Sequence, residues 1–422
     1  MPKSGGDKGK KSTRGESKKA PVDEDQLRRD LHDTIKSKDT QKPKSNTAMS
    51  SEARPSHAED FRIGGVEGGG TRSTLIVMDG RGKQLARVEG PGTNHWALDM
   101  KETATRINEM ITRAKKDCEM PENHPLDCVG LYLSGCEEEK TNGQLVETLL
   151  QEFPAASREY VIGSDTVGSL STGTANCGVV LIAGTGSNSL LVNADGKTVG
   201  CGGWGHIIGD EGSAYLIAHH ACKYVFDDID GRIPAPHPTS YVWPAMRNYF
   251  KVTDRNGMLP HLYANFDKSK IALFTKELAA GCEKGDPLCG LLFEDNGRYL
   301  AQYVNALARK ADNEAKLCPG GLKVICIGSV WKSWEFMKKG FLKEIEEGHA
   351  IDELTLTKLT VPSAVGACYR AGEHLKCDTL KKTYDENTET FYHYQRGETP
   401  LDGVTRGSRN ITDREERGAT CT

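Results

Sequence analysis

Two glycine-rich turns carry the residue types that proteins use to bind phosphate. The first consists of Gly69, Gly70 and Thr71, and the second repeats the pattern as Gly184, Thr185 and Gly186. Glycine N–H groups can approach an anion closely, and threonine adds a hydroxyl donor. Each turn lies between two strand-like runs. This excludes a P-loop or dinucleotide fingerprint, because both need a helix directly after the glycines. Either turn alone fits an ordinary hairpin, but the pair predicts a polyphosphate held between two halves of the chain.

Two carboxylates stand where they could take part in phosphate chemistry. Glu67 precedes the first turn and could hold a hydrated Mg²⁺, an ion that prefers oxygen ligands. Asp165 follows the apolar run 160–162, and ligands of α/β sheets bind at the carboxyl ends of the strands. Asp165 is therefore a candidate general base. The alternative is an N-cap of the following helix, a role for which aspartate is equally suited.

Aromatic and polar side chains gather in two further loops. The stretch 200–212 is the densest in glycine and contains Trp204 and Asp210, while Asn94 and Trp96 follow another glycine turn. Sugar pockets combine aromatic faces with a few polar groups that bind hydroxyls, and these are suitable residue types. Asn94 and Trp96 also fit a helix cap beside a surface tryptophan, so that alternative stays open.

The apolar pattern predicts the elements that position these residues. In the first half we expect strands at 63–67, 74–78, 84–88, 128–133 and 159–163, with a helix at 100–114. In the second half we expect strands at 178–183, 187–193 and 323–327, and helices at 213–226, 268–284, 287–311 and 362–374. Gly328 and Ser329 follow the strand at 323–327, where a turn of small residues suits close packing against a nucleotide. Both halves begin with a strand, a glycine turn and a returning strand, which indicates a duplicated α/β unit.

Composition divides the chain into four parts. The 422 residues are enough for two to three domains. Residues 1–60 have very few large aliphatic side chains, which predicts a disordered N-terminal tail. We expect an N-terminal α/β lobe at 61–176, a larger C-terminal α/β lobe at 177–376 and a polar tail at 377–422. The helix at 362–374 is a candidate to pack back on the N-terminal lobe.

Charge and composition also exclude several classes of protein. With 55 Lys+Arg and 59 Asp+Glu the net charge is −4, so the whole chain has no basic footprint for nucleic acid. We expect no membrane contact, because the sequence has no transmembrane run and no secretory signal. The 13 cysteines include no C-x-x-C pair, which fits a reducing cytosol better than a disulfide framework or a zinc site.

Several strings of this sequence, in the same order, resemble the N-acetylglucosamine kinase family. They are GGVEGGGTRS, GPGTNHWALD, SDTVGS, LIAGTGSN, GCGGWGHIIGDEGSAY, FDK and CIGSVWKSW, within about residues 63–374. The family belongs to the sugar kinase/heat-shock 70/actin superfamily. This implies an α/β, two-lobed actin-like ATPase fold with ribonuclease H-like lobes and an ATP and sugar cleft between them. The segment Gly135-Cys136-Glu137-Glu138 departs from the family's usual Gly-Gly-Asp.

The resemblance implies a reaction and a set of site residues. The γ-phosphate of ATP would pass, with Mg²⁺, to the 6-hydroxyl of N-acetylglucosamine, with N-acetylmannosamine as a related substrate, and Asp165 would be the catalytic base. The implied ATP contacts are Gly69, Gly70, Thr71, Gly184, Thr185, Gly186, Ala272, Gly328 and Ser329. The implied sugar contacts are Asn94, Trp96, Asp165, Gly203, Trp204, Gly205 and Asp210. The resemblance also implies a cytoplasmic homodimer.

An alternative function comes from the same superfamily. It includes activator ATPases that do conformational work on a partner, some through a bridging iron–sulfur cluster. The scattered cysteines of this chain form no recognisable cysteine-rich loop. ATP consumption that depends on sugar would indicate the kinase, and ATP consumption indifferent to sugar would indicate the activator.

Overall fold

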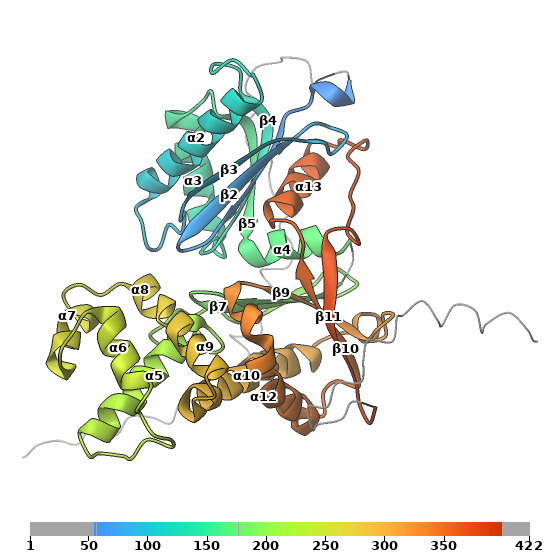
Figure 1. Cartoon of the computed structure of the whole chain (residues 1–422). Helices are drawn as coiled ribbons and strands as arrows, with labels where there is room; N and C mark the ends of the chain where they lie inside the picture. The colour runs from blue at the N-terminus through green and yellow to red at the C-terminus, as the bar shows by residue number, and fades with distance from the viewer. Residues whose placement is uncertain (1–54, 56, 176, 399–422) are drawn as a thin grey trace, which may run out of the picture. The chain divides into compact units, whose positions relative to one another are not determined.

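The computed structural model describes residues 55, 57–175 and 177–398 (Figure 1). Five strands form its first sheet: β1 (Ile63–Gly68), β2 (Arg72–Met78), β3 (Gln84–Pro91), β4 (Leu126–Leu133) and β5 (Ser157–Ser164). The spatial order is β3-β2-β1-β4-β5. Strands β1 to β3 form an antiparallel meander, and β4 and β5 continue the sheet parallel to β1.

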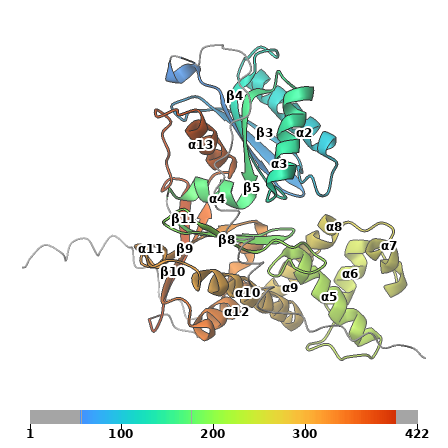
Figure 2. The same ribbon diagram turned by 180° about the vertical axis from the view of Figure 1, so that it is seen from behind.

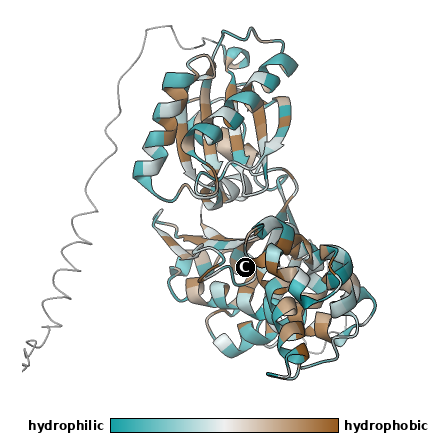
Figure 3. Ribbon diagram, turned by 90° about the vertical axis from the view of Figure 1, so that its left-hand side faces the viewer, coloured by the Kyte–Doolittle hydropathy of each residue, from teal (hydrophilic) through white to brown (hydrophobic). Residues whose placement is uncertain are grey.

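Helices cover both faces of the first sheet. Successive residues of a strand point to opposite faces, so each strand packs against both layers of helices. Leu75 of β2 packs in a core with α2 (Met100–Asp117) and α3 (Glu139–Glu152). The next residue, Ile76, packs on the other face with α13 (Ala364–His374). Figures 1 and 2 show α2 and α3 on one side of this sheet and α13 on the other. In Figure 3 hydrophobic residues are concentrated in the strands, whereas the helices beside them carry many hydrophilic residues.

The second sheet repeats the plan of the first. Its strands are β6 (Gly178–Ala183), β7 (Ser187–Val192), β8 (Thr198–Gly202), β9 (Leu322–Ile327), β10 (Glu353–Leu359) and β11 (Thr388–Gln395). The order β11-β10-β9-β6-β7-β8 contains the same antiparallel meander, β6 to β8, followed by two parallel strands, β9 and β10. The internal duplication expected from the sequence is therefore present in the topology.

Most helices of the second half share one core with this sheet. Between β8 and β10 the chain forms α5 (Ala214–Ile229), α6 (Val242–Phe250), α7 (Leu259–Leu262), α8 (Lys268–Leu273), α9 (Thr275–Glu283), α10 (Pro287–Ala308), α11 (Asn313–Lys316) and α12 (Trp334–Gly348), with short 3₁₀ segments η2 (Arg255–Met258) and η3 (Ser329–Ser333). On the opposite face, Leu170 of α4 (Asp165–Gly173) packs against Val180 and Ile325.

Helices α4 and α13 cross at very short range. A Cβ atom on Gly366 of α13 would lie 2.3 Å from the carbonyl oxygen of Gly168, so no other residue fits without movement. Thr172 Oγ1 accepts a hydrogen bond from the N–H of Gly366 (2.9 Å) and lies 3.1 Å from the carbonyl oxygen of Ser363. This crossing holds the start of α4, where Asp165 lies, against the start of α13.

Two of the expected boundaries need correction. The polar segment after residue 376 was expected to be a loose tail, but within its described part β11 pairs antiparallel with β10. As an edge strand, β11 buries only Tyr394 fully, so its sequence has little apolar signal. At the other end, the segment η1 (Ala58–Asp60) belongs to the body, because Ala58 O accepts a hydrogen bond from Gly80 N (2.8 Å). Residues 1–54 and 56, expected to be disordered, lie outside the described residues.

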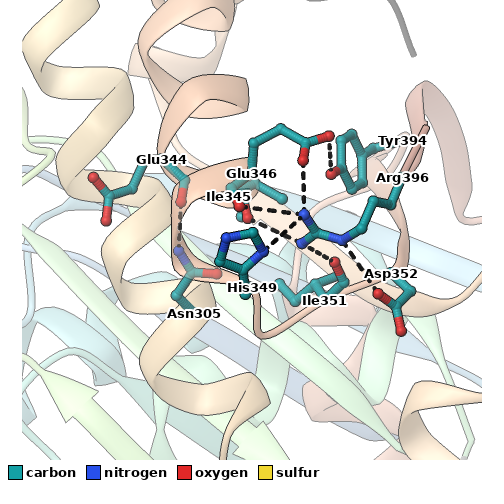
Figure 4. A network of polar contacts seen from close by, with 9 residues as sticks. All are labelled: Asn305, Glu344, Ile345, Glu346, His349, Ile351, Asp352, Tyr394 and Arg396. Carbon is teal, nitrogen blue, oxygen red and sulfur yellow. Dashed lines mark hydrogen bonds and ion pairs between the residues drawn. The ribbon is translucent and has the colours of Figure 1, made fainter. Parts of the chain in front are cut away.

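Arg396 fastens the end of β11 to the end of α12 (Figure 4). Its guanidinium donates to the carboxylate of Glu346 (2.7 Å), to the carbonyl oxygen of Ile351 (2.8 Å) and to Asp352 (3.2 Å). Tyr394 donates to the other oxygen of Glu346 (2.5 Å). The side chain of Arg396 is 25% exposed, so these charge-assisted bonds are partly shielded from water.

We therefore expect Arg396→Met to lower the free energy of unfolding by about 1–3 kcal/mol, because several partly buried acceptors lose their donor. Urea denaturation followed by circular dichroism measures this. The matched control is Lys358→Met, which removes an exposed ion pair with Glu389 (3.3 Å) between β10 and β11. Exposed pairs contribute about 0–1 kcal/mol. Equal losses for the two variants would contradict a special role for Arg396.

Candidate active site

The two glycine turns meet in the structure. Thr71 Oγ1, after β1, lies 3.4 Å from Thr185 Oγ1, after β6. Thr71 Oγ1 also lies 3.2 Å from Ser269 Oγ in α8. No atom would lie within 4 Å of a Cβ at Gly70, so the first turn borders open space. The structure thus brings together hydroxyls and glycine N–H groups from both halves, a suitable set of donors for phosphate oxygens.

Asp210 is attached to the second turn. Its Oδ1 accepts a hydrogen bond from the N–H of Ser187 (3.0 Å), and its Oδ2 lies 2.6 Å from Lys268 Nζ. A Cβ on Gly186 would lie only 2.7 Å from Asp210 Oδ1, so the close approach requires glycine. Asp210, expected as a sugar contact, therefore links the loop 203–210 to the second glycine turn.

Gly328 lies beside the second turn as well. Its φ is +106°, and a Cβ there would lie 2.3 Å from the carbonyl oxygen of Ala183. Ser329 is exposed at the start of η3, next to this contact. Ala272 is different, because its side chain is 4% exposed and belongs to the core of the second half. Ala272 therefore offers little surface to a nucleotide in this structure.

Asp165 is the first residue of α4, but it is not the cap. Ser164 is the N-cap residue, and its Oγ accepts a hydrogen bond from Thr166 N (3.4 Å). Burial, followed by the negative charge of Glu137, raises the pKa of Asp165 to about 7. A carboxyl group with such a pKa can exchange a proton near neutral pH, which general acid–base chemistry requires.

Glu137 is a residue that the sequence reasoning missed. Ser164 Oγ lies 3.4 Å from Glu137 Oε1 and 3.3 Å from Asp165 Oδ1, so the serine bridges the two carboxylates. The only available signal was the unusual segment 135–138, which we noted as a departure from the family and assigned no role.

Asn94 and Trp96 lie in the same part of the first half as this segment. Asn94 Oδ1 accepts from Trp96 N (2.9 Å), and its Nδ2 lies 3.4 Å from Ser134 Oγ. The indole Nε1 of Trp96 donates to the carbonyl oxygen of Gly135 (2.8 Å). Asp99, not Asn94, caps the helix that follows, so the cap alternative for Asn94 does not apply.

The loop of the second half expected to bind sugar is open. Trp204 is 74% exposed, and Gly203 and Gly205 both have positive φ (81° and 75°). A Cβ at Gly203 would approach Asn188 Oδ1 to 2.7 Å, whereas one at Gly205 would meet no atom. The indole therefore stands in solvent on a glycine-flanked loop.

Glu67 contacts the start of α13. Its carboxylate accepts a hydrogen bond from the N–H of Ala364 (3.2 Å) at the start of α13, and burial raises its pKa. In addition, no group of three or more His, Cys, Asp or Glu side chains in the described residues could hold a metal. The indirect role of Glu67 toward a hydrated Mg²⁺ therefore stays a prediction.

A pocket of about 520 Å³ opens beside Glu67, at the carboxyl ends of β9 and β10. Its lining includes Glu67, Gly328, Trp331, Trp334, Ser363 and Phe391. Of the residues assigned to the site from the sequence, only Glu67 and Gly328 line it. The remaining site residues differ in exposure, since Trp204 and Ser329 are exposed whereas Asp210 and Ala272 are buried.

The chain belongs to the BadF/BadG/BcrA/BcrD ATPase family, whose model matches residues 65–369. It is 28% identical over 266 residues to N-acetyl-D-glucosamine kinase of Dictyostelium discoideum, covering 60% of this chain and 81% of that protein. It is 24% identical over 245 residues to N-acetylmuramic acid/N-acetylglucosamine kinase of Clostridium acetobutylicum, covering 58% and 78%. These findings confirm the resemblance that the motifs indicated.

A solved structure supports the fold assignment. A protein from Chromobacterium violaceum, provisionally assigned as an N-acetylglucosamine kinase, superimposes with a TM-score of 0.59 at 19% identity. The match covers 73% of this chain and 98% of that one. It confirms the α/β fold class expected from the sequence. Within the described part of the chain, no helix has both the length and the apolar composition to cross a bilayer.

The site geometry predicts how Asp165 responds to pH. Folding raises the pKa of Asp165 to about 7. Between about pH 4 and about pH 7 the carboxyl group is therefore mainly protonated in the folded state and mainly ionised in the unfolded state. The protein should therefore lose stability relative to Asp165→Asn as pH rises through this window, with no further loss above it. Urea titrations of both proteins from pH 4 to 9 measure the difference.

Glu137→Gln should shrink that difference, because it removes the second-largest cause of the raised pKa. Glu67 contributes in the same direction more weakly, while Ser164 and the N–H of Thr166 oppose it. The matched control is Glu138→Gln, an exposed neighbour that has no part in the shift of Asp165. If both glutamate variants behave alike, Glu137 does not act on Asp165.

Proposed function

We propose that this protein is an ATP-dependent kinase that phosphorylates the 6-hydroxyl of N-acetyl-D-glucosamine, in amino-sugar salvage. N-acetylmannosamine is proposed as a second acceptor. The observation that carries the proposal is the contact between Thr71 and Thr185, which joins the two glycine turns at one place. The names of the two curated relatives support the sugar kinase class.

In this proposal the two turns hold the phosphates of ATP. The glycine N–H groups and both threonine hydroxyls donate to phosphate oxygens, so that charge on the transferring group is compensated. Mg²⁺ is proposed to arrive with ATP, coordinated mainly by phosphate oxygens and water. The proposed ATP contacts are Gly69, Gly70, Thr71, Gly184, Thr185, Gly186, Ala272, Gly328 and Ser329.

The acceptor sugar is proposed to bind between groups of both halves. Asn94 and Trp96 would contribute from the first half, and Gly203, Trp204, Gly205 and Asp210 from the second. Trp204 and Trp96 are 74% and 65% exposed, so both indoles are available to cover an apolar sugar face. Closure over the sugar would exclude water, which otherwise competes as the phosphoryl acceptor.

Asp165 is proposed to take the proton of the 6-hydroxyl as that oxygen attacks the γ-phosphorus. Its raised pKa suits a base that works near pH 7, because the proton acceptor must be ionised yet basic enough to take the proton. A cytoplasmic homodimer remains part of the proposal, from the resemblance alone.

Asp165→Asn should therefore lower kcat by about 10²–10⁴-fold, the usual contribution of general-base assistance. Asparagine keeps the size and much of the hydrogen bonding, so sugar affinity should change less than kcat. Initial rates measure both constants. The matched control is Asp286→Asn, which alters an aspartate that caps α10 by accepting from Cys289 N (2.9 Å) and should leave kcat unchanged. A folded Asp165→Asn protein with more than about a tenth of the original kcat removes Asp165 from the mechanism.

The reaction itself is tested by its stoichiometry. ATP consumption should rise on addition of N-acetylglucosamine, with one sugar phosphate formed per ADP, because the hydroxyl and not water is the acceptor. A coupled ADP assay with a panel of N-acetylhexosamines measures this, and NMR of the product shows whether phosphorus is attached at carbon 6. ATP hydrolysis that no sugar changes would contradict the kinase proposal and favour the activator ATPase of the same superfamily.

A further inference from the structure

Lys268 occupies a place between the two glycine turns that the sequence reasoning left without a role. It is the first residue of α8, which Asp267 caps by accepting from Ser269 N (2.8 Å) and Lys270 N (3.1 Å). The cap fixes the start of this helix against both turns. Ser269 reaches Thr71 of the first turn, as described above, and Lys268 points to the second turn.

The ammonium group of Lys268 touches the second turn directly. A Cβ at Gly186 would lie 3.0 Å from Lys268 Nζ, so the ammonium group lies close beside this turn. Lys268 Nζ also lies 2.6 Å from Asp210 Oδ2. The side chain of Asp210 is 3% exposed and that of Lys268 is 30% exposed. The carboxylate is therefore buried, whereas the lysine side chain is partly accessible to solvent.

The ion pair leaves Lys268 with capacity for a further ligand. An ammonium group has three N–H donors, and its contact with Asp210 Oδ2 is an ion pair at 2.6 Å. Asp210 Oδ1 is engaged with Ser187 N, which holds the carboxylate in place. Burial, followed by the positive charge of Lys268, lowers the pKa of the nearby His206.

We infer that Lys268 binds the phosphoryl group that is transferred, with Asp210 orienting its ammonium group. This inference rests on the proposed function, since it assigns a cation to the same site. Phosphoryl transfer depends on positioning and on compensation of negative charge, and a lysine at the terminal phosphate supplies both. No bond to Lys268 forms or breaks, and the ammonium group keeps its protons throughout.

The inference also connects the donor and acceptor sides of the reaction. Asp210 belongs to the loop that carries Trp204, and it holds both Lys268 and the N–H of Ser187. A sugar that orders this loop would also order the ammonium group of Lys268 beside the second glycine turn. Transfer to water in the absence of sugar would then be disfavoured, because the cation would be less well placed.

The test compares three substitutions of Lys268 with a control on the same helix. Lys268→Met removes charge and hydrogen bonding, Lys268→Gln keeps a donor for Asp210, and Lys268→Arg keeps the charge. Lys270→Met is the control, because Lys270 is exposed and its Nζ lies 3.3 Å from His261 Nδ1, on another contact. If Lys268→Met fails to fold because Asp210 loses its partner, Lys268→Gln carries the test.

Binding of two nucleotides gives a readout that does not need turnover. We expect Lys268→Gln to weaken binding of the β,γ-imido analogue of ATP by roughly tenfold or more, as for loss of one charged hydrogen bond. Binding of ADP, which lacks the transferred phosphate, should stay within about twofold of the original affinity, because that phosphate is the lost partner. Titration calorimetry in the presence of Mg²⁺ measures both. Equal losses for the two nucleotides, or none, overturn the inference.

Kinetics then separate this inference from the proposed function. The Gln and Met variants should lose about 10²–10³-fold in kcat, as for removal of one preorganised donor, while Arg should restore most of it. Lys270→Met should be unchanged. Full activity of the Lys268 variants beside an inactive Asp165→Asn overturns the role of Lys268 and leaves the kinase intact. If the unaltered protein phosphorylates no sugar, the proposed function fails, and nucleotide binding alone decides whether Lys268 contacts the terminal phosphate.

Discussion

The close crossing of α4 and α13 is the constraint on which the site depends. Gly366 packs on the backbone of Gly168, and Thr172 bonds to the first turn of α13, so the two helices cannot slide independently. Asp165 begins one helix, and the other begins where Glu67 supplies its carboxylate to Ala364 N. One steric contact thus helps to position both Asp165, a candidate base, and the start of the helix that Glu67 contacts.

Duplication explains why two similar turns come together. Each sheet has an antiparallel meander followed by parallel strands, so each presents the turn after its first strand at an equivalent place. The hydroxyls of Thr71 and Thr185 then lie 3.4 Å apart, although 114 residues separate them. A hairpin turn alone has little meaning, whereas two turns that face each other form a set of donors around one space.

Charge is divided between the halves in a way that suits transfer of a phosphoryl group. Glu137 and Asp165 both lie near Ser164 Oγ in the first half. Burial of Asp165, followed by the negative charge of Glu137, raises the pKa of Asp165 and favours its protonated form near neutral pH. Lys268 lies in the second half, against a glycine turn and a buried aspartate. Under the proposed function, the carboxylates would lie on the acceptor side and the cation on the phosphate side.

The sequence by itself determined the α/β class, the duplicated halves, the family and the turns at Thr71 and Thr185, because these depend on local patterns of apolar residues and glycine. It missed β11, whose edge position needs few apolar residues, and it gave no sign that the carboxylate of Glu67 accepts a hydrogen bond from Ala364 N at the start of α13. Only the tertiary structure decided that Ser164 rather than Asp165 caps α4, that Glu137 stands beside Asp165, and that Lys268 pairs with Asp210. The physical reason is that pKa shifts, ion pairs and shared hydrogen bonds act between side chains far apart in the chain, and their distances are set by packing that no local pattern records.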